Sequence, residues 1–101
     1  MQLEIQLLAE RESEAAAFHY ERQSDGLGTR FLDELHKAYD LIVQFPNAWT
    51  RVGKRVRKIG LNRFPYLVFY AVYHKRIVIL AIAPMSRKPF YWKDRLRELQ
   101  E

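Results

Sequence analysis

Cysteine is absent from the 101-residue chain, and glycine and proline are scarce, with four of each. The lack of cysteine excludes a disulfide scaffold, a thiolate zinc site and a thiol nucleophile, and it fits a reducing compartment. The longest apolar run, from Ile77 to Ala83, is far too short to span a bilayer. The N-terminus carries Glu4 but no early lysine or arginine, so it lacks the features of a secretory signal. We expect one cytoplasmic domain over residues 1–101, without membrane contact.

Carboxylates are missing from almost half of the chain. Residues 47–93 hold eleven lysines and arginines but no aspartate or glutamate, whereas residues 1–46 hold nine acids against four bases. Behind the net charge of +5 is therefore a half of the chain whose positive charges have no carboxylates nearby in sequence to neutralise them. The positive electrostatic field of this half favours a polyanion or an acidic partner. We expect this half to fold into a sheet that gathers its cations on a common surface. The alternative is a solubilising charge spread over several faces.

Hydrophobic patterning predicts a strand and two helices in the acidic half. Residues 3–8 alternate apolar and polar, which is typical of a short strand with one buried face. Residues 9–23 are rich in alanine and glutamate, which favour helix. Over residues 27–45 apolar side chains recur at spacings of four and three, as in an amphipathic helix, and Pro46 ends that helix. This stripe comprises Phe31, Leu35, Ala38, Ile42 and Phe45. The short link between the helices predicts an antiparallel helical hairpin.

The basic half predicts a sheet. After a loop over residues 47–54, three runs at about 55–61, 65–73 and 76–83 are rich in β-branched and aromatic residues. Only His74-Lys75 separates the last two runs, so we expect them to pair as a tight hairpin. The third run is apolar on both faces, which is typical of a central strand covered on both sides.

The C-terminal residues predict a third helix. It extends from about residue 89, where Pro89 can open it, to residue 100. Its inward face would be formed by Tyr91, Trp92, Leu96 and Leu99. The resulting order, β-α-α-β-β-β-α, indicates an α+β fold in which a small, mainly antiparallel sheet packs against the N-terminal helical hairpin.

Several segments carry a resemblance when they are taken in order. They are the stretch from Asp25 to Leu35, Phe45-Pro46, Val56-Arg57-Lys58, Arg63-Phe64-Pro65-Tyr66, Val68-Phe69-Tyr70, and Arg87-Lys88-Pro89 with Tyr91-Trp92. Together they resemble the RelE/ParE superfamily of type II toxins over roughly residues 4–95, and the ParE or plasmid-stabilisation branch more than RelE. The resemblance implies a RelE/ParE-like fold and a cytoplasmic, growth-inhibiting toxin that a cognate antitoxin holds inactive.

The resemblance implies two different targets. In RelE-like members the target is messenger RNA on the ribosome, and in ParE-like members it is DNA gyrase. We favour inhibitory binding, because the sequence offers no convincing acid–base pair. The alternatives are a metal-independent, ribosome-dependent mRNA endoribonuclease and a non-toxic basic nucleic-acid-binding module, so enzymatic activity stays open here. The resemblance also implies an antitoxin that is small and acidic and forms a hetero-oligomer with the toxin, which agrees with the basic half.

Metal-independent RNA cleavage would need groups that stabilise a phosphorane and groups that transfer protons. The catalytic candidates for RNA cleavage are Arg57, Lys58, Arg87 and Tyr91. Arginine matches phosphate oxygens with a planar fork, but it is too basic to be a convincing general base, so the base would have to be Lys58 or Tyr91. Because Arg57 and Lys58 are adjacent on a strand, they face opposite sides, and at most one of them enters a given groove.

Six further residues are candidates for contacts with the target or with RNA: Arg55, Arg63, Tyr66, Tyr70, Arg76 and Lys88. Tyr66 and Tyr70 share one face of their strand. We expect no cofactor and no metal site, because the three histidines are scattered and neither cysteines nor paired acids accompany them. We interpret His74 as a solvated turn residue, and His19 and His36 as surface or packing residues.

Overall fold

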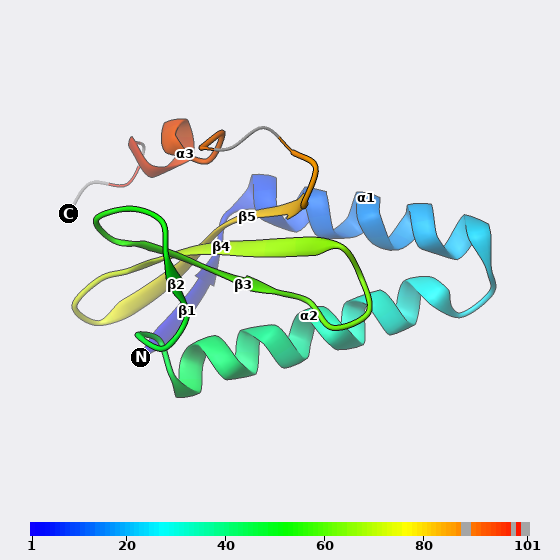
Figure 1. Ribbon diagram of the computed structural model, residues 1–101, viewed down its shortest axis with the longest axis horizontal. Coiled ribbons are helices and arrows are strands. Elements are labelled where there is room, and N and C mark those ends of the chain that lie inside the picture. The colour runs from blue at the N-terminus through cyan, green and yellow to red at the C-terminus, as the bar shows by residue number, and fades with distance from the viewer. Residues whose placement is uncertain (88–89, 98, 100–101) are drawn as a thin grey trace.

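A helical hairpin covers one face of a five-stranded sheet, and a C-terminal segment covers the other face (Figure 1). The computed structural model describes residues 1–87, 90–97 and 99. Its elements are β1 (Gln2–Ile5), α1 (Leu7–Gln23), α2 (Leu27–Gln44), β2 (Thr50–Arg51), β3 (Val56–Gly60), β4 (Tyr66–Val72), β5 (Arg76–Pro84) and α3 (Lys93–Arg97). No helix in the described ranges has the length and apolar character needed to cross a membrane.

The sheet has the strand order β1-β5-β4-β3-β2. Strand β1 runs parallel to β5, and every other neighbouring pair is antiparallel, which confirms the predicted α+β fold with a mainly antiparallel sheet. The hairpin between β4 and β5 turns through His74 and Lys75, where the Tyr73 amide donates to the Arg76 carbonyl at 2.9 Å. His74 is exposed at that turn, as predicted.

The predicted strand over residues 3–8 is shorter in the structure, and its last residues are helical. Pairing of β1 with β5 ends at Ile5, opposite Ile79. The next carbonyl, that of Gln6, already accepts a hydrogen bond from the Glu10 amide at 3.0 Å, so the helix begins there. Leu7 and Leu8 consequently lie exposed on α1 and do not contribute to the buried face of a strand.

Strand β2 lies inside the segment predicted to be a loop, residues 47–54. It consists of only two residues, Thr50 and Arg51, which pair with Lys58 and Arg57 of β3. Two exposed polar residues carry no hydrophobic alternation, so periodicity could not reveal this strand. The observed order is therefore β-α-α-β-β-β-β-α, with one strand more than predicted.

The two long helices approach each other closely at Gly28. A Cβ atom at this position would lie 2.5 Å from the carbonyl oxygen of Ala17 on α1, so a larger residue would push the helices apart. The Glu21 carboxylate at the end of α1 accepts hydrogen bonds from the amides of Gly26 (2.9 Å) and Gly28 (3.0 Å). These contacts satisfy amides at the start of α2 that would otherwise lack a partner. The contacts between α1 and α2 thus form the predicted antiparallel hairpin.

The stripe on α2 forms the core against the sheet, with one exception. Phe31, Leu35 and Ile42 have at most 1% of their surface exposed. Phe45, which was predicted to continue the stripe, is 54% exposed. It lies just beyond the helix at its C-cap, because Pro46 disfavours helical geometry in the preceding residue.

Apolar side chains alternate between the two faces of β4 and β5. Val68, Ile77 and Ile79 face the helical hairpin, whereas Phe69 and Leu80 belong to the cluster on the opposite face. Strand β5 therefore lies inside the sheet and is covered on both sides, as predicted.

The C-terminal helix is shorter than predicted. It spans Lys93–Arg97, and the predicted start at Pro89 lies outside the described residues. Phe90 has a φ of 65°, which is incompatible with a right-handed helix through that residue. The inward face is nevertheless as predicted, since Tyr91, Trp92, Leu96 and Leu99 all pack on the second face of the sheet.

Candidate functional site

A cavity of about 320 Å³ lies on the second face of the sheet, between β3, β4 and the C-terminal segment. Its polar lining comes from Lys58, Arg87 and Tyr91. The other lining residues are apolar: Val52, Leu67, Phe69, Pro84, Met85, Phe90 and Trp92. We call it the second-face pocket. Three of the four predicted catalytic candidates thus line a single cavity.

Arg57, the fourth candidate, does not line this pocket. It faces the helical side of the sheet, where its Nη1 atom donates a hydrogen bond to the carbonyl of Trp49 at 2.8 Å. Lys58, the next residue of β3, lines the second-face pocket. This arrangement agrees with the alternation predicted for two adjacent strand residues.

The ring of Tyr91 contacts two arginines. The guanidinium carbon of Arg87 is 4.5 Å from the ring centroid, and that of Arg95 is 5.1 Å away. Arg87 and Tyr91 both precede α3, so their contact forms outside that helix. Such cation–π contacts favour a fixed ring position.

The Tyr91 hydroxyl is buried and has no hydrogen-bond partner among the described residues. Burial raises the pKa of Tyr91 well above the ordinary tyrosine value, Glu12 raises it further, and Arg95 and Arg87 oppose the shift. The phenol is therefore held in its protonated form at neutral pH. A group in this state can donate a proton but does not act as a base.

Glu12 and Arg95 hold the C-terminal segment over the pocket. The carboxylate of Glu12 contacts Arg95 at 2.7 and 2.9 Å and also accepts the amide of Ile82 at 3.0 Å. Arg95 donates to the carbonyl of Leu80 at 2.9 Å. The pair thus provides hydrogen-bond partners for backbone groups of β5 that lie beyond its pairing with β1. Neither residue was predicted, because each is unremarkable within its own segment.

The two tyrosines predicted to contact a target face the helical hairpin. Tyr70 has no exposed surface, and its hydroxyl donates to the carbonyl of Pro46 at 2.8 Å. Tyr66 is partly buried and lies 5.1 Å from Phe31 between ring centroids. They share a strand face as predicted, but that face is directed into the core. Tyr70 offers no surface to a partner.

Two of the predicted arginines contact the same aromatic ring. The guanidinium carbons of Arg55 and Arg76 lie 5.1 and 5.2 Å from the centroid of Tyr73. Arg76 also forms an ion pair with Glu4 at 2.8 Å, so its charge is partly compensated. Lys88 lies outside the described residues.

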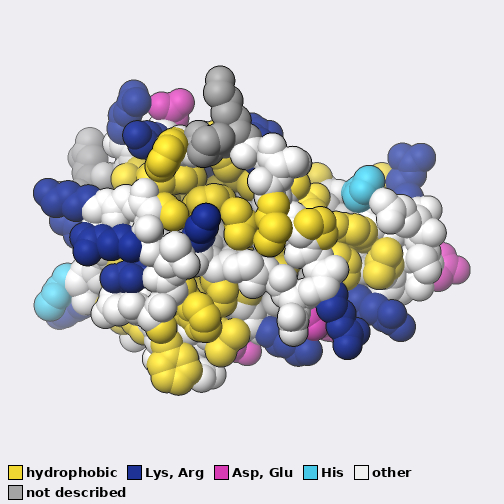
Figure 2. All heavy atoms as spheres, viewed as in Figure 1, with side chains coloured by type: hydrophobic (Ala, Val, Ile, Leu, Met, Phe, Trp, Pro, Cys, Tyr) yellow, Lys and Arg dark blue, Asp and Glu magenta, His cyan; other side chains and the backbone are white. Residues whose placement is uncertain are grey.

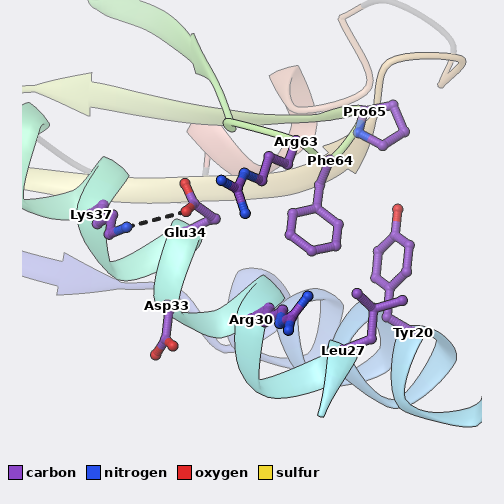
Figure 3. Close-up of a pocket in the computed structure, with 9 residues that line it drawn as sticks. All are labelled: Tyr20, Leu27, Arg30, Asp33, Glu34, Lys37, Arg63, Phe64 and Pro65. Atoms are coloured by element: carbon purple, nitrogen blue, oxygen red, sulfur yellow. Dashed lines mark hydrogen bonds and ion pairs between the residues drawn. The ribbon is translucent and has the colours of Figure 1, made fainter. Parts of the chain in front are cut away.

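Arg63 lines a different cavity, of about 550 Å³, at the opposite end of the sheet (Figure 3). Its side chain extends over the cavity toward Glu34, which forms an ion pair with Lys37 at 3.2 Å. Arg30 and Asp33 also line this cavity, so its charges are mixed. The backbone of Arg63 has a φ of 70°, a left-handed conformation that side-chain-bearing residues rarely adopt.

The cations of the basic half do not share one surface. Figure 2 shows a group of lysine and arginine side chains at the end of the molecule that carries the β2–β3 and β4–β5 connections. Arg63 of the basic half lines the cavity at the opposite end. Lys58 and Arg87 form another group in the second-face pocket. The predicted common surface is wrong, because successive connections of an antiparallel sheet lie at opposite ends.

A family model described as the ParE toxin of the type II toxin–antitoxin system, parDE, matches residues 3–89. The chain belongs to the ParE toxin family. A chain of the chromosomal ParDE system from P. aeruginosa is similar, with a TM-score of 0.61 at 21% identity, over 83% of this chain and 95% of that chain. The isolated E. coli RelE toxin gives a TM-score of 0.53 at 16% identity, over 97% and 98% of the two chains. No curated protein matches the chain in sequence.

Membership in the ParE family confirms the resemblance and the predicted fold. The protein is a toxin of a type II toxin–antitoxin system, and the family implies an antitoxin as its partner. The matched residues include Lys58 and Arg87 but end before Tyr91 and Arg95. The C-terminal part of the second-face pocket therefore lies beyond the region that defines the family in this chain.

Proposed function

We propose that this ParE-family toxin inhibits growth by binding DNA gyrase and that it does not cleave messenger RNA. The composition of the second-face pocket carries this proposal. Lys58, Arg87 and Tyr91 stand among apolar side chains, and the described lining contains no carboxylate and no imidazole. RNA cleavage would need a group that takes a proton from the ribose hydroxyl and another that protonates the leaving oxygen.

The arrangement of the candidate groups disfavours that chemistry. Tyr91 stays protonated, so it cannot supply the base. Arg57 lies on the other side of the sheet and cannot act with Arg87 on one phosphate. Lys58 alone would have to complete the proton transfers.

The same pocket suits recognition of a protein. An apolar cavity with two cations at its lining can receive an apolar side chain of a partner while contacting a nearby acidic group. Interfaces of this kind concentrate their binding energy in a small buried cluster. We propose that Lys58 and Arg87 make these contacts with gyrase.

We also propose that the cognate antitoxin is small and acidic. The toxin has a net charge of +5, and its basic residues are concentrated in the half that lacks carboxylates. An acidic partner would reduce this charge and associate rapidly through electrostatic attraction.

The proposed function can be tested with purified toxin in two parallel assays. One follows DNA supercoiling by gyrase, and the other follows messenger RNA integrity on translating ribosomes. We expect loss of supercoiling activity with intact transcripts. Rapid transcript cleavage with unaffected gyrase would overturn the proposal in favour of a RelE-like endoribonuclease.

Matched variants link the effect to the pocket. The double substitution Lys58→Gln with Arg87→Gln removes both pocket cations, and we expect it to weaken gyrase inhibition at least tenfold. The control, Arg22→Gln with Arg30→Gln, removes the same charge from exposed positions elsewhere. Equal inhibition by both double variants would remove the pocket from the proposed site.

A further inference from the structure

A third cavity, of about 190 Å³, lies at the end of the sheet where β2 meets β3. Four cations line it, namely Arg51, Lys54, Arg55 and Arg57, together with Asn47 and Val72. No carboxylate is among these lining residues. We call it the basic cavity. It belongs to the basic end of the molecule visible in Figure 2.

Neutral groups hold two of its guanidinium groups in place. Arg51 donates to the carbonyls of Gly53 (3.2 Å) and Lys54 (2.9 Å), and Arg57 donates to the carbonyl of Trp49 (2.8 Å). Carbonyl oxygens fix the positions of the side chains without cancelling their charges. The cavity is therefore preorganised for an anion that would supply the missing negative charge.

The pairing of β2 with β3 places like charges together. Arg51 and Arg57 are direct partners across the two strands and line the same cavity. Like charges directly opposite each other destabilise a sheet. Arg55 is fixed nearby, 5.1 Å from the buried ring of Tyr73. The arrangement lowers the stability of the free protein and favours a bound anion.

We propose that the basic cavity binds the phosphodiester backbone of a nucleic acid. Guanidinium forks match phosphate oxygens in shape and charge, and backbone contacts need no particular base sequence. An acidic polypeptide is the less suitable partner, because Val72 is the single apolar side chain in the lining and offers little anchorage for a peptide. This site goes beyond the proposed recognition of gyrase and does not depend on it.

The test measures binding of labelled nucleic acid to the full-length toxin over a series of salt concentrations. A short DNA duplex and a single-stranded RNA, both of arbitrary sequence, distinguish the two sources of phosphodiester. We expect Arg51→Gln with Arg55→Gln to weaken binding of one of them at least tenfold. The log–log salt slope should become shallower by about 0.9 per lost contact for duplex DNA, or about 0.7 for a single strand.

Two further variants keep this test interpretable. Lys54→Gln with Arg55→Gln keeps the hydrogen bonds that Arg51 donates, so it provides a second test should the Arg51→Gln, Arg55→Gln protein fail to fold. We expect this variant to weaken binding as well. The control, Arg22→Gln with Arg30→Gln, removes equal charge elsewhere and should leave the salt slope nearly unchanged. Equal losses in the control and the cavity variants, or tighter binding of polyglutamate than of either nucleic acid, would overturn the proposal. Because gyrase inhibition is measured separately, its failure would leave this result unaffected.

Discussion

Glu12 on α1 and Arg95 on α3 stand 83 residues apart in the sequence and form a two-point ion pair. The Arg95 side chain is 14% exposed and that of Glu12 is 23% exposed, so water screens the pair only partly. The pair also meets the amide of Ile82 and the carbonyl of Leu80 on β5. It is the principal polar link between the C-terminal segment and the body of the described structure.

Replacing Glu12 by glutamine should therefore loosen this link. The substitution keeps the size of the side chain but leaves the Arg95 charge without a carboxylate in a mostly buried place. We expect the free energy of unfolding to fall by about 2 kcal/mol. Urea denaturation measures this change, with Glu14→Gln, an exposed position on the same helix, as the control. A similar loss in both variants would show that the pair has no special role.

Removing the hydroxyl of Tyr91 should not harm the fold. This hydroxyl is buried with no partner among the described residues, so it loses water on folding without gaining a hydrogen bond. We expect Tyr91→Phe to raise the free energy of unfolding by roughly 1 kcal/mol. We also expect it to retain toxicity, because the proposed contacts with gyrase come from Lys58 and Arg87, and the ring that contacts Arg87 stays in place.

The comparison with Tyr91→Ala makes this prediction specific. The alanine variant removes the ring that Arg87 and Arg95 contact, and it should reduce both stability and toxicity. Loss of growth inhibition in a stable Tyr91→Phe protein would instead point to a catalytic hydroxyl. Thermal unfolding and growth after induction provide the two measurements.

Local patterns in the sequence predicted most of the fold. The α2 stripe buries one face at the period of a helix, whereas the β-branched runs of β4 and β5 bury alternate residues on both faces of the sheet. Strand β2 was not predicted, because its two residues show no alternation of apolar and polar side chains. Phe45 matched the helical spacing, yet it lies past the end of the helix, where Pro46 overrides the pattern.

The candidate site could be predicted only in part. Lys58, Arg87 and Tyr91 meet because they lie on elements that cover the same sheet face. The sequence does not reveal which face of a strand a helix will cover, so Tyr70 was expected at a surface but is buried. The contact between Glu12 and Arg95 joins two distant segments, and no spacing rule connects them.

Replacing Arg63 by glycine should stabilise the toxin. Arg63 has a φ of 70°, where a side chain costs on the order of 1–2 kcal/mol and glycine does not. Glycine loses part of that gain through the greater freedom of the unfolded chain, so we expect a net increase of about 0.5–1 kcal/mol. The control, Arg63→Ala, removes the same charge but keeps the strained backbone. Equal stabilities of the two variants would contradict the role of backbone strain.

The stability of the toxin should decline at alkaline pH in part because of Tyr70. Burial raises the pKa of Tyr70 to about 12, although Arg57 acts to lower it. An unfolded tyrosine releases its proton near pH 10, so above that pH the unfolded state binds fewer protons than the folded state. The contribution of Tyr70 is thus complete below about pH 10 and is lost as the pH rises toward 12, by up to about 2–3 kcal/mol.

The variant Tyr70→Phe isolates this effect. At neutral pH we expect it to be about 1 kcal/mol less stable than the wild type, because it loses the hydrogen bond to the carbonyl of Pro46. Its stability should fall less steeply between about pH 10 and 12, since it has no proton to release there. A residual decline remains, because burial also raises the pKa values of Tyr39 and Tyr91. Urea denaturation across this range measures both slopes, and parallel curves for the two proteins would contradict the assignment to Tyr70.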